Sequence, residues 1–131
     1  MNLMNWNNCE KNFIRKISID EFQIKSIKQK ALKRLERAKN SDDVDLVVED
    51  YYEVIKELLV CLMLSKGLRS KNHQCLITYF YKITQNEADA LLISQMSYFR
   101  NRLVYYGEDV PSSFLDRKKF EEIINLIQSL F

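Results

Sequence analysis

The stretch "DVDLVVEDYYEVIKELLVCLMLSK", from Asp43 to Lys66, decides the fold class. Its apolar residues recur every three or four positions, which is the period of an α-helix with one buried face. The main apolar stripe consists of Val44, Val48, Tyr51, Ile55, Leu58, Leu62 and Met63. Because the last two turns are apolar nearly all round, we predict that this is the central, most buried helix and that Gly67 ends it.

One helix is predicted before this segment and another after it. The first follows "SIDE", where Ser18 and Glu21 have the spacing of a capping box, and its apolar residues repeat at helical intervals to about Lys39. Another short helix is predicted around Gln74 to Lys82, after the basic loop "LRSKNH".

A fourth predicted helix opens at a second capping-box match, Thr84 and Glu87, and runs to Tyr106 before Gly107. One arc of this helix is expected to face the core: Ala88, Leu92, Met96, Phe99, Leu103 and Tyr106. A second stripe holds Tyr98, Asn101 and Tyr105, and the side away from the core holds Ile93, Arg100 and Val104. Since these other faces carry large apolar side chains, a second surface must cover them. That surface is either another helix of the chain or a partner subunit, and we favour the partner subunit.

A fifth helix follows a loop that contains Pro111. Its apolar stripe consists of Phe120, Ile123, Ile124, Ile127 and Leu130. With only two glycines and one proline in 131 residues, few turns are expected. The sequence therefore predicts a single all-α domain over residues 1–131, an up-and-down four-helix bundle with an additional C-terminal helix. Residues 1–17 are expected to form a loosely packed arm, with Trp6 and Phe13 as anchors.

Charge and cysteine usage favour a cytoplasmic protein that is not attached to a membrane. The net charge is only +2, but Asp20–Lys39 carries a net charge of +4 and Asp43–Lys66 a net charge of −4, as in two neighbouring helices with complementary faces. The three cysteines, Cys9, Cys61 and Cys75, have no paired spacing and are expected to be reduced thiols. The longest apolar run is too short to cross a bilayer, and no signal peptide is visible.

The segment "FRNRLVYYG" resembles the signature of the HEPN domains, an Arg usually followed by Asn and then, after a few residues, by His. The resemblance extends upstream to "YYEVIKELLVCLMLSKGLRSKNH" and to "ALKRLERAKN", and it covers roughly residues 25 to 107. It implies an up-and-down four-helix bundle with an extra short helix, usually a homodimer whose Arg-Asn motifs line a cleft between the subunits. Many members are metal-independent endoribonucleases, often toxins paired with a minimal nucleotidyltransferase antitoxin, and others bind RNA or nucleotides without catalysis.

The resemblance makes Arg100, Asn101 and Tyr105 the candidate catalytic residues. Arg100 matches the arginine that clamps a phosphate, and Asn101 matches the polar residue that orients the site. Tyr105 stands where the histidine is expected, and because only about one part in a thousand of a tyrosine with pKa ~10 is deprotonated at neutral pH, it is a poor general base. Tyr105 is suited instead to hydrogen bonding with phosphate or to stacking on a base. The tyrosine that the antitoxin usually modifies is also absent, since Gly107 stands there.

Further candidate nucleic-acid contacts are Arg102, Tyr98, Arg69, Lys71 and His73. His73, the only histidine, matches the histidine of the family's inter-helix loop, and it is either a structural group at a helix start or a replacement for the missing base. For Arg100 and Arg102 the alternative is a helix C-terminus that favours cations, and for Arg69 and Lys71 a solvated loop. With a single histidine and no glycine-rich phosphate loop, neither a metal nor another cofactor is expected.

We expect a homodimer that binds RNA or a nucleotide phosphate in the cleft between its subunits, with cleavage weak or absent. Two alternatives remain at this point. One is an active metal-independent endoribonuclease toxin, in which Tyr105 or His73 replaces the missing histidine. The other is a non-catalytic partner module for a minimal nucleotidyltransferase.

Overall fold

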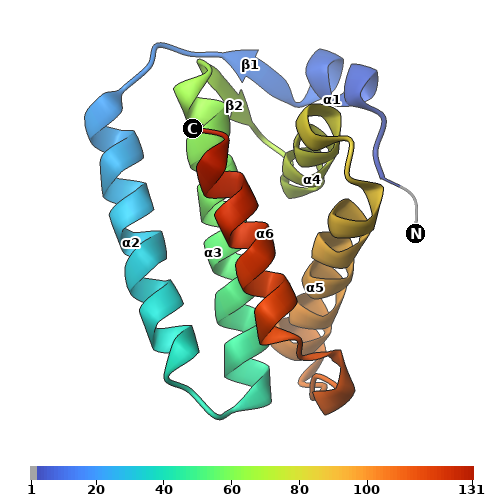
Figure 1. Cartoon of the computed structure of the whole chain (residues 1–131). Helices are drawn as coiled ribbons and strands as arrows, with labels where there is room; N and C mark the ends of the chain where they lie inside the picture. The colour runs from blue at the N-terminus through green and yellow to red at the C-terminus, as the bar shows by residue number, and fades with distance from the viewer. Residues whose placement is uncertain (1–2) are drawn as a thin grey trace.

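The computed structural model describes residues 3–131 and is mostly helical, as expected (Figure 1). Its α-helices are α1 (Trp6–Asn12), α2 (Glu21–Lys39), α3 (Val44–Ser65), α4 (His73–Thr84), α5 (Glu87–Tyr106) and α6 (Arg117–Ser129). A 3-10 turn, η1 (Ser112–Phe114), precedes α6, and two short strands, β1 (Ile14–Lys16) and β2 (Leu68–Ser70), form an antiparallel ribbon that was not predicted. No helix within residues 3–131 is long and apolar enough to span a membrane.

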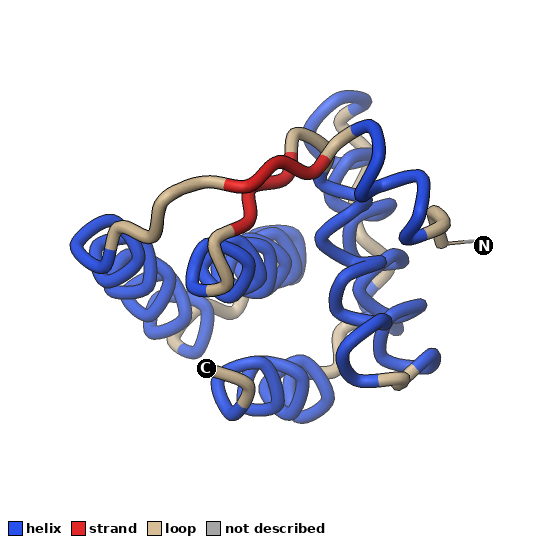
Figure 2. The backbone as a smooth tube through the Cα atoms, turned by 90° about the horizontal axis from the view of Figure 1, so that it is seen from above, coloured by secondary structure: helices blue, strands red, loops and turns tan. Residues whose placement is uncertain are grey.

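Helix α3 is the central element, as its composition predicts. It contacts α2, α5 and α6, and the view along the helices in Figure 2 shows these neighbours arranged around it. The Asp43 side chain accepts a hydrogen bond from the Leu46 backbone N–H at 3.2 Å and so caps the start of the helix. After α3, Gly67 adopts a left-handed conformation (φ = 73°), which glycine reaches without steric cost.

Opposite charges join α2 to α3. The guanidinium of Arg37 donates two hydrogen bonds to the carboxylate of Asp50, at 2.6 and 3.0 Å. One turn away, Arg34 Nε lies 3.3 Å from Glu57 Oε1. The basic α2 therefore lies along acidic positions of α3, which confirms that the two charged segments are neighbouring helices with complementary faces.

Residues 3–17, the described part of the predicted N-terminal arm, are not loosely packed. Helix α1 contacts α4, and Cys9, which is fully buried, forms a disulfide with Cys75. After α1, strand β1 pairs with β2 in the register Ile14↔Ser70, Arg15↔Arg69 and Lys16↔Leu68. The expectation of three reduced thiols is therefore wrong for Cys9 and Cys75, and only Cys61 is a free, buried cysteine.

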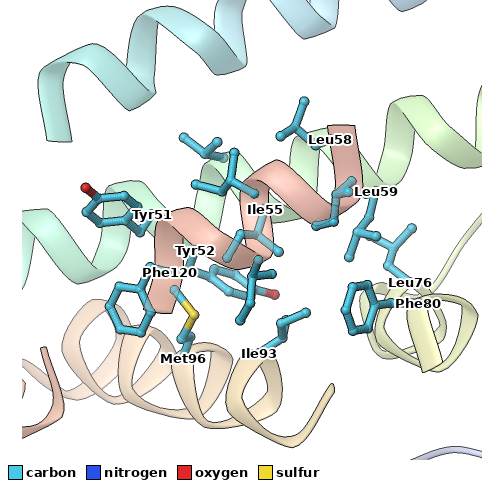
Figure 3. Close-up of a cluster of buried hydrophobic side chains, with 14 of the residues drawn as sticks. Tyr51, Tyr52, Ile55, Leu58, Leu59, Leu76, Phe80, Ile93, Met96 and Phe120 are labelled. Atoms are coloured by element: carbon cyan, nitrogen blue, oxygen red, sulfur yellow. The ribbon is translucent and has the colours of Figure 1, made fainter. Parts of the chain in front are cut away.

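The core-facing side of α5 differs from the predicted arc. Ile93, expected on the far side, is 1% exposed, whereas Tyr106, expected in the core, is 67% exposed, and Ala88 is also exposed. Figure 3 shows Ile93 and Met96 pointing into the cluster of buried side chains that includes Tyr52 of α3. The surface that covers Ile93 therefore belongs to the same chain and not to a partner subunit.

Two helix starts are capped by residues other than the predicted ones. Asp20 caps α2, because its carboxylate accepts a hydrogen bond from the Gln23 N–H at 3.0 Å, so Ser18 lies outside the helix. Asn86 caps α5 by accepting from the Asp89 N–H, also at 3.0 Å. Thr84 instead ends α4, where its hydroxyl donates to the Phe80 carbonyl. In both cases the cap lies two residues after the one that the capping-box match predicts, so the helix begins later than expected.

Candidate functional site

Arg100 projects from α5 toward α3. Its Nη2 atom lies 3.0 Å from Glu53 Oε1, and its Nη1 atom donates to Asn101 Oδ1 at 3.1 Å. The side chains of Arg100 and Glu53 are 23% and 11% exposed, so the ion pair is mostly withdrawn from solvent. Arg100 and Asn101 are therefore joined as the motif implies, but Arg100 lies on the covered side of α5 and not on the side away from the core.

Glu53 also binds Lys56, and this makes it the centre of a three-residue cluster. Lys56 Nζ lies 2.6 Å from Glu53 Oε2, and its side chain is 19% exposed. Two cations around one carboxylate leave a net single positive charge in a half-buried position, where charge acts more strongly than in open water. We call Arg100, Glu53 and Lys56 the Glu53 cluster. Sequence reasoning missed Glu53 and Lys56, since nothing local distinguishes them from the other charged residues of α3.

His73 lies close to the Glu53 cluster. It is the first residue of α4, after Asn72, whose side chain caps the helix by accepting from the Gln74 N–H at 2.8 Å. Burial lowers the pKa of His73 from its usual 6.5, the cations Lys56 and Arg100 lower this pKa further, and Glu53 opposes them. The imidazole is therefore neutral at neutral pH and able to accept a proton. The fold thus brings His73 near enough to Arg100 for their charges to interact, although the two are far apart in the sequence.

This arrangement predicts how the pKa of His73 responds to its neighbours. We expect a value below 6.5 in the wild type, a higher value in Lys56→Ala, and a still lower value in Glu53→Gln. Since the sequence contains one histidine, an NMR titration of its ring signals measures each value directly. Lys118→Ala, a change of an exposed lysine on α6, is the matched control and should leave the pKa unchanged. A pKa that stays constant in both cluster variants would contradict the placement of His73.

The lowered pKa also determines the sign of a pH effect on stability. The folded value lies below the unfolded value of 6.5, so the unfolded chain takes up the proton first. The contribution of His73 to stability is therefore present above pH 6.5 and is lost as the pH falls through the folded pKa.

Tyr105 is not brought to Arg100. Residues five positions apart on a helix point about 140° away from each other, since an α-helix turns about 100° per residue. The stripe of Tyr98, Asn101 and Tyr105 is present as predicted, with Tyr98 50% and Tyr105 69% exposed. The two tyrosine rings are thus open to a ligand or a partner, but neither ring belongs to the Glu53 cluster.

Arg102 is engaged elsewhere. Its guanidinium forms a two-pronged ion pair with Glu108 and lies 4.3 Å from the ring centre of Tyr106. The hydrogen bond from Arg102 lowers the pKa of the Glu108 carboxyl. To bind nucleic acid as predicted, Arg102 would have to break its ion pair with the exposed Glu108 carboxylate or bind the phosphate together with it.

The basic loop residues lie on the β1–β2 ribbon. Arg69, in β2, stands directly opposite Arg15 in β1, and Lys71 extends the pairing through its N–H, which donates to the Phe13 carbonyl at 2.8 Å. Arg15, Arg69 and Lys71 are all exposed. Two like charges directly opposite each other destabilise a strand pair, so this placement favours a negatively charged ligand at the ribbon. Arg15 was missed because its pairing joins segments far apart in the chain.

Within the described residues, no group of three or more His, Cys, Asp or Glu side chains is arranged to hold a metal ion. In comparisons with protein-family models, with curated proteins and with solved structures, no match to this chain was found.

Proposed function

We propose that this chain is a HEPN-like helical protein that binds RNA or a nucleotide phosphate in a cleft between two copies of itself, with a degenerate ribonuclease site. In this proposal α2, α3, α5 and α6 correspond to the family's up-and-down bundle and α4 to its extra short helix, so that the C-terminal helix belongs to the bundle and is not an addition to it. The observation that carries the proposal is the convergence of Arg100 from α5 and Lys56 from α3 on the single carboxylate of Glu53, with His73 at the start of α4 close enough for its pKa to respond to all three.

Arg100 and Lys56 are the phosphate-binding groups in this proposal. Their net charge with Glu53 is positive, and a phosphate oxygen that replaces one contact of Glu53 gains charge-assisted hydrogen bonds in a partly buried place. Asn101 holds the guanidinium through the hydrogen bond to Nη1. Exposed Tyr98 and Tyr105 supply flat surfaces on which bases stack, a contact worth about 1–3 kcal/mol per base.

The second copy is proposed from the exposed face of α5. Tyr98, Val104 and Tyr105 are each 45% exposed or more, although they belong to a helix whose opposite side is buried. Large apolar side chains that gather on one face are typical of interfaces. A copy that covers this face would bring a second Glu53 cluster to the same cleft.

The test measures RNA retention by the wild type and by Arg100→Gln. We expect the variant to lose at least about tenfold in affinity for a mixed-sequence single-stranded RNA, since a hydrogen bond to a charged group contributes about 1.5–3 kcal/mol. Fluorescence anisotropy at fixed low salt, with EDTA present, gives both dissociation constants.

The matched control is Lys119→Gln. Lys119 Nζ lies 2.9 Å from Oδ1 of Asp89, which is 5% exposed, so this change also removes the cation from a buried carboxylate. Unchanged affinity in Lys119→Gln with a loss in Arg100→Gln supports the proposal. Equal affinity of the wild type and Arg100→Gln, or no RNA retention by the wild type, contradicts it. An equal loss in both variants assigns the effect to stability.

A second candidate function is metal-independent RNA cleavage with His73 as the general base. It is favoured by the lowered pKa of His73 beside Arg100, because the reaction needs a neutral base next to a cation at the scissile phosphate. The same incubation distinguishes the two functions when the RNA is also run on a denaturing gel. Cleavage that persists in EDTA and disappears in His73→Gln identifies a nuclease, whereas retained, intact RNA identifies a binding protein.

A further inference from the structure

A pocket of about 280 Å³ opens between α2, α3, β2 and α4, next to His73. Its inner surface is apolar, with Met63, Leu64 and Leu76 as buried residues and Ile27 and Val60 as half-buried walls. This volume lies just below the roughly 300 Å³ at which ordinary small-molecule pockets begin. The pocket therefore suits a single ring system and not a large ligand.

The rim of the pocket is polar and positively charged. Arg69 and His73 lie on it, and Arg15 stands opposite Arg69 on the ribbon. Neither arginine forms an ion pair with any residue in the described part of the chain. The amide of Gln23 also lines the pocket, and it offers both a hydrogen-bond donor and an acceptor. An apolar interior, one amide and free guanidinium groups favour a ligand with a flat, partly polar ring and an anionic group.

We infer that this pocket takes the base of a nucleotide, with a phosphate of that nucleotide against Arg69 and Arg15. This inference rests on the proposed function and adds to it a binding pocket for one base. His73 links the two places, because it lines the pocket and its pKa responds to Arg100, Lys56 and Glu53.

The experiment compares ligands that differ only in the base. Isothermal titration calorimetry measures the binding of adenosine 5′-monophosphate, uridine 5′-monophosphate and ribose 5-phosphate. We expect at least one of the two nucleotides to bind the wild type about tenfold more tightly than ribose 5-phosphate, since the base would bury its apolar faces against the aliphatic walls of the pocket. Ile27→Trp, which fills the pocket from α2, should remove this difference and leave the affinity for ribose 5-phosphate unchanged.

The matched control is Leu32→Trp, which adds the same ring to α2 at a position 38% exposed and outside the pocket. It should keep the wild-type preference for the nucleotide. Equal affinity of the wild type for both nucleotides and for ribose 5-phosphate overturns the base pocket, as does a preference that survives in Ile27→Trp.

The RNA assay separates this inference from the proposed function. Loss of RNA affinity in Arg100→Gln, with nucleotide binding unaffected by Ile27→Trp, overturns the pocket and leaves the proposed function standing. Nucleotide binding that Ile27→Trp abolishes, in a protein that does not retain RNA, supports the pocket and overturns the proposed RNA function. If the wild type binds none of these probes, both are overturned.

Discussion

Glu53→Ala is expected to lower the free energy of unfolding by about 3–5 kcal/mol, the usual cost of removing one partner from a buried ion pair. The change leaves Arg100 and Lys56, which are 23% and 19% exposed, without the carboxylate that both contact. Their charges would then remain poorly solvated in the folded protein only. Urea denaturation followed by far-UV circular dichroism measures the effect.

Glu49→Ala is the control for this prediction. Glu49 lies on the same helix one turn earlier, and no ion pair to it is present among residues 3–131. We expect it to change stability by no more than about 0.5 kcal/mol. If Glu53→Ala is equally mild, the Glu53 cluster is solvated and the buried phosphate site loses its main support.

Cys9→Ser is expected to lower the free energy of unfolding by about 4 kcal/mol under oxidising conditions. The Cys9–Cys75 disulfide spans a sequence separation of 66 residues, and closing a loop of this length removes much of the conformational freedom of the unfolded chain. Urea denaturation with and without a reductant measures the effect. The reductant should destabilise the wild type by the same amount and leave Cys9→Ser unchanged.

Cys61→Ala provides the comparison, because it leaves the disulfide intact. Its stability should still depend on the reductant, as that of the wild type does. Burial raises the pKa of Cys61 to about 11, so this thiol is protonated at neutral pH and should be alkylated only after unfolding. Mass spectrometry that finds three free thiols in the oxidised, unfolded wild type would contradict the Cys9–Cys75 pairing.

The helices with clear apolar periods could be predicted closely from the sequence. Helix α3 begins and ends within one residue of the expected positions, and α5 ends at the expected Tyr106. Gly67 and Gly107 follow the two helices in left-handed conformations, with φ of 73° and 66°. Which side of α5 faces the core could not be predicted. That helix carries apolar residues around most of its circumference, so its period does not determine a single buried direction.

The short N-terminal elements were missed because their stability comes from distant residues. Helix α1 has only seven residues and is capped by Asn5 within a run of asparagines, which by itself is typical of an irregular segment. The strands of the ribbon have three residues each and pair across the whole α2–α3 hairpin. No local pattern in the sequence reports such contacts, and the pairing of Cys9 with Cys75 depends on the same long-range closure.

The candidate site was predicted in part for a similar reason. Arg100, Asn101 and His73 could be proposed from the motif and from the loop histidine. Glu53 and Lys56 could not, because their role depends on α5 lying against α3. The motif also implied that Tyr105 acts at the same site as Arg100. Helical geometry instead turns the Tyr105 side chain away from Arg100.

The ribbon between β1 and β2 imposes an order of events during synthesis on the ribosome. Residues 14–16 leave the exit tunnel long before residues 68–70, their only strand partners, and Cys9 precedes Cys75 by 66 positions. The α2–α3 hairpin lies between these segments, and its two helices, which follow each other in the chain, pack closely together, so their pairing needs a shorter loop closure than the ribbon does. Residues 9–16 therefore stay without their partners until β2 and α4 have emerged, and α5 and α6 complete the fold after that.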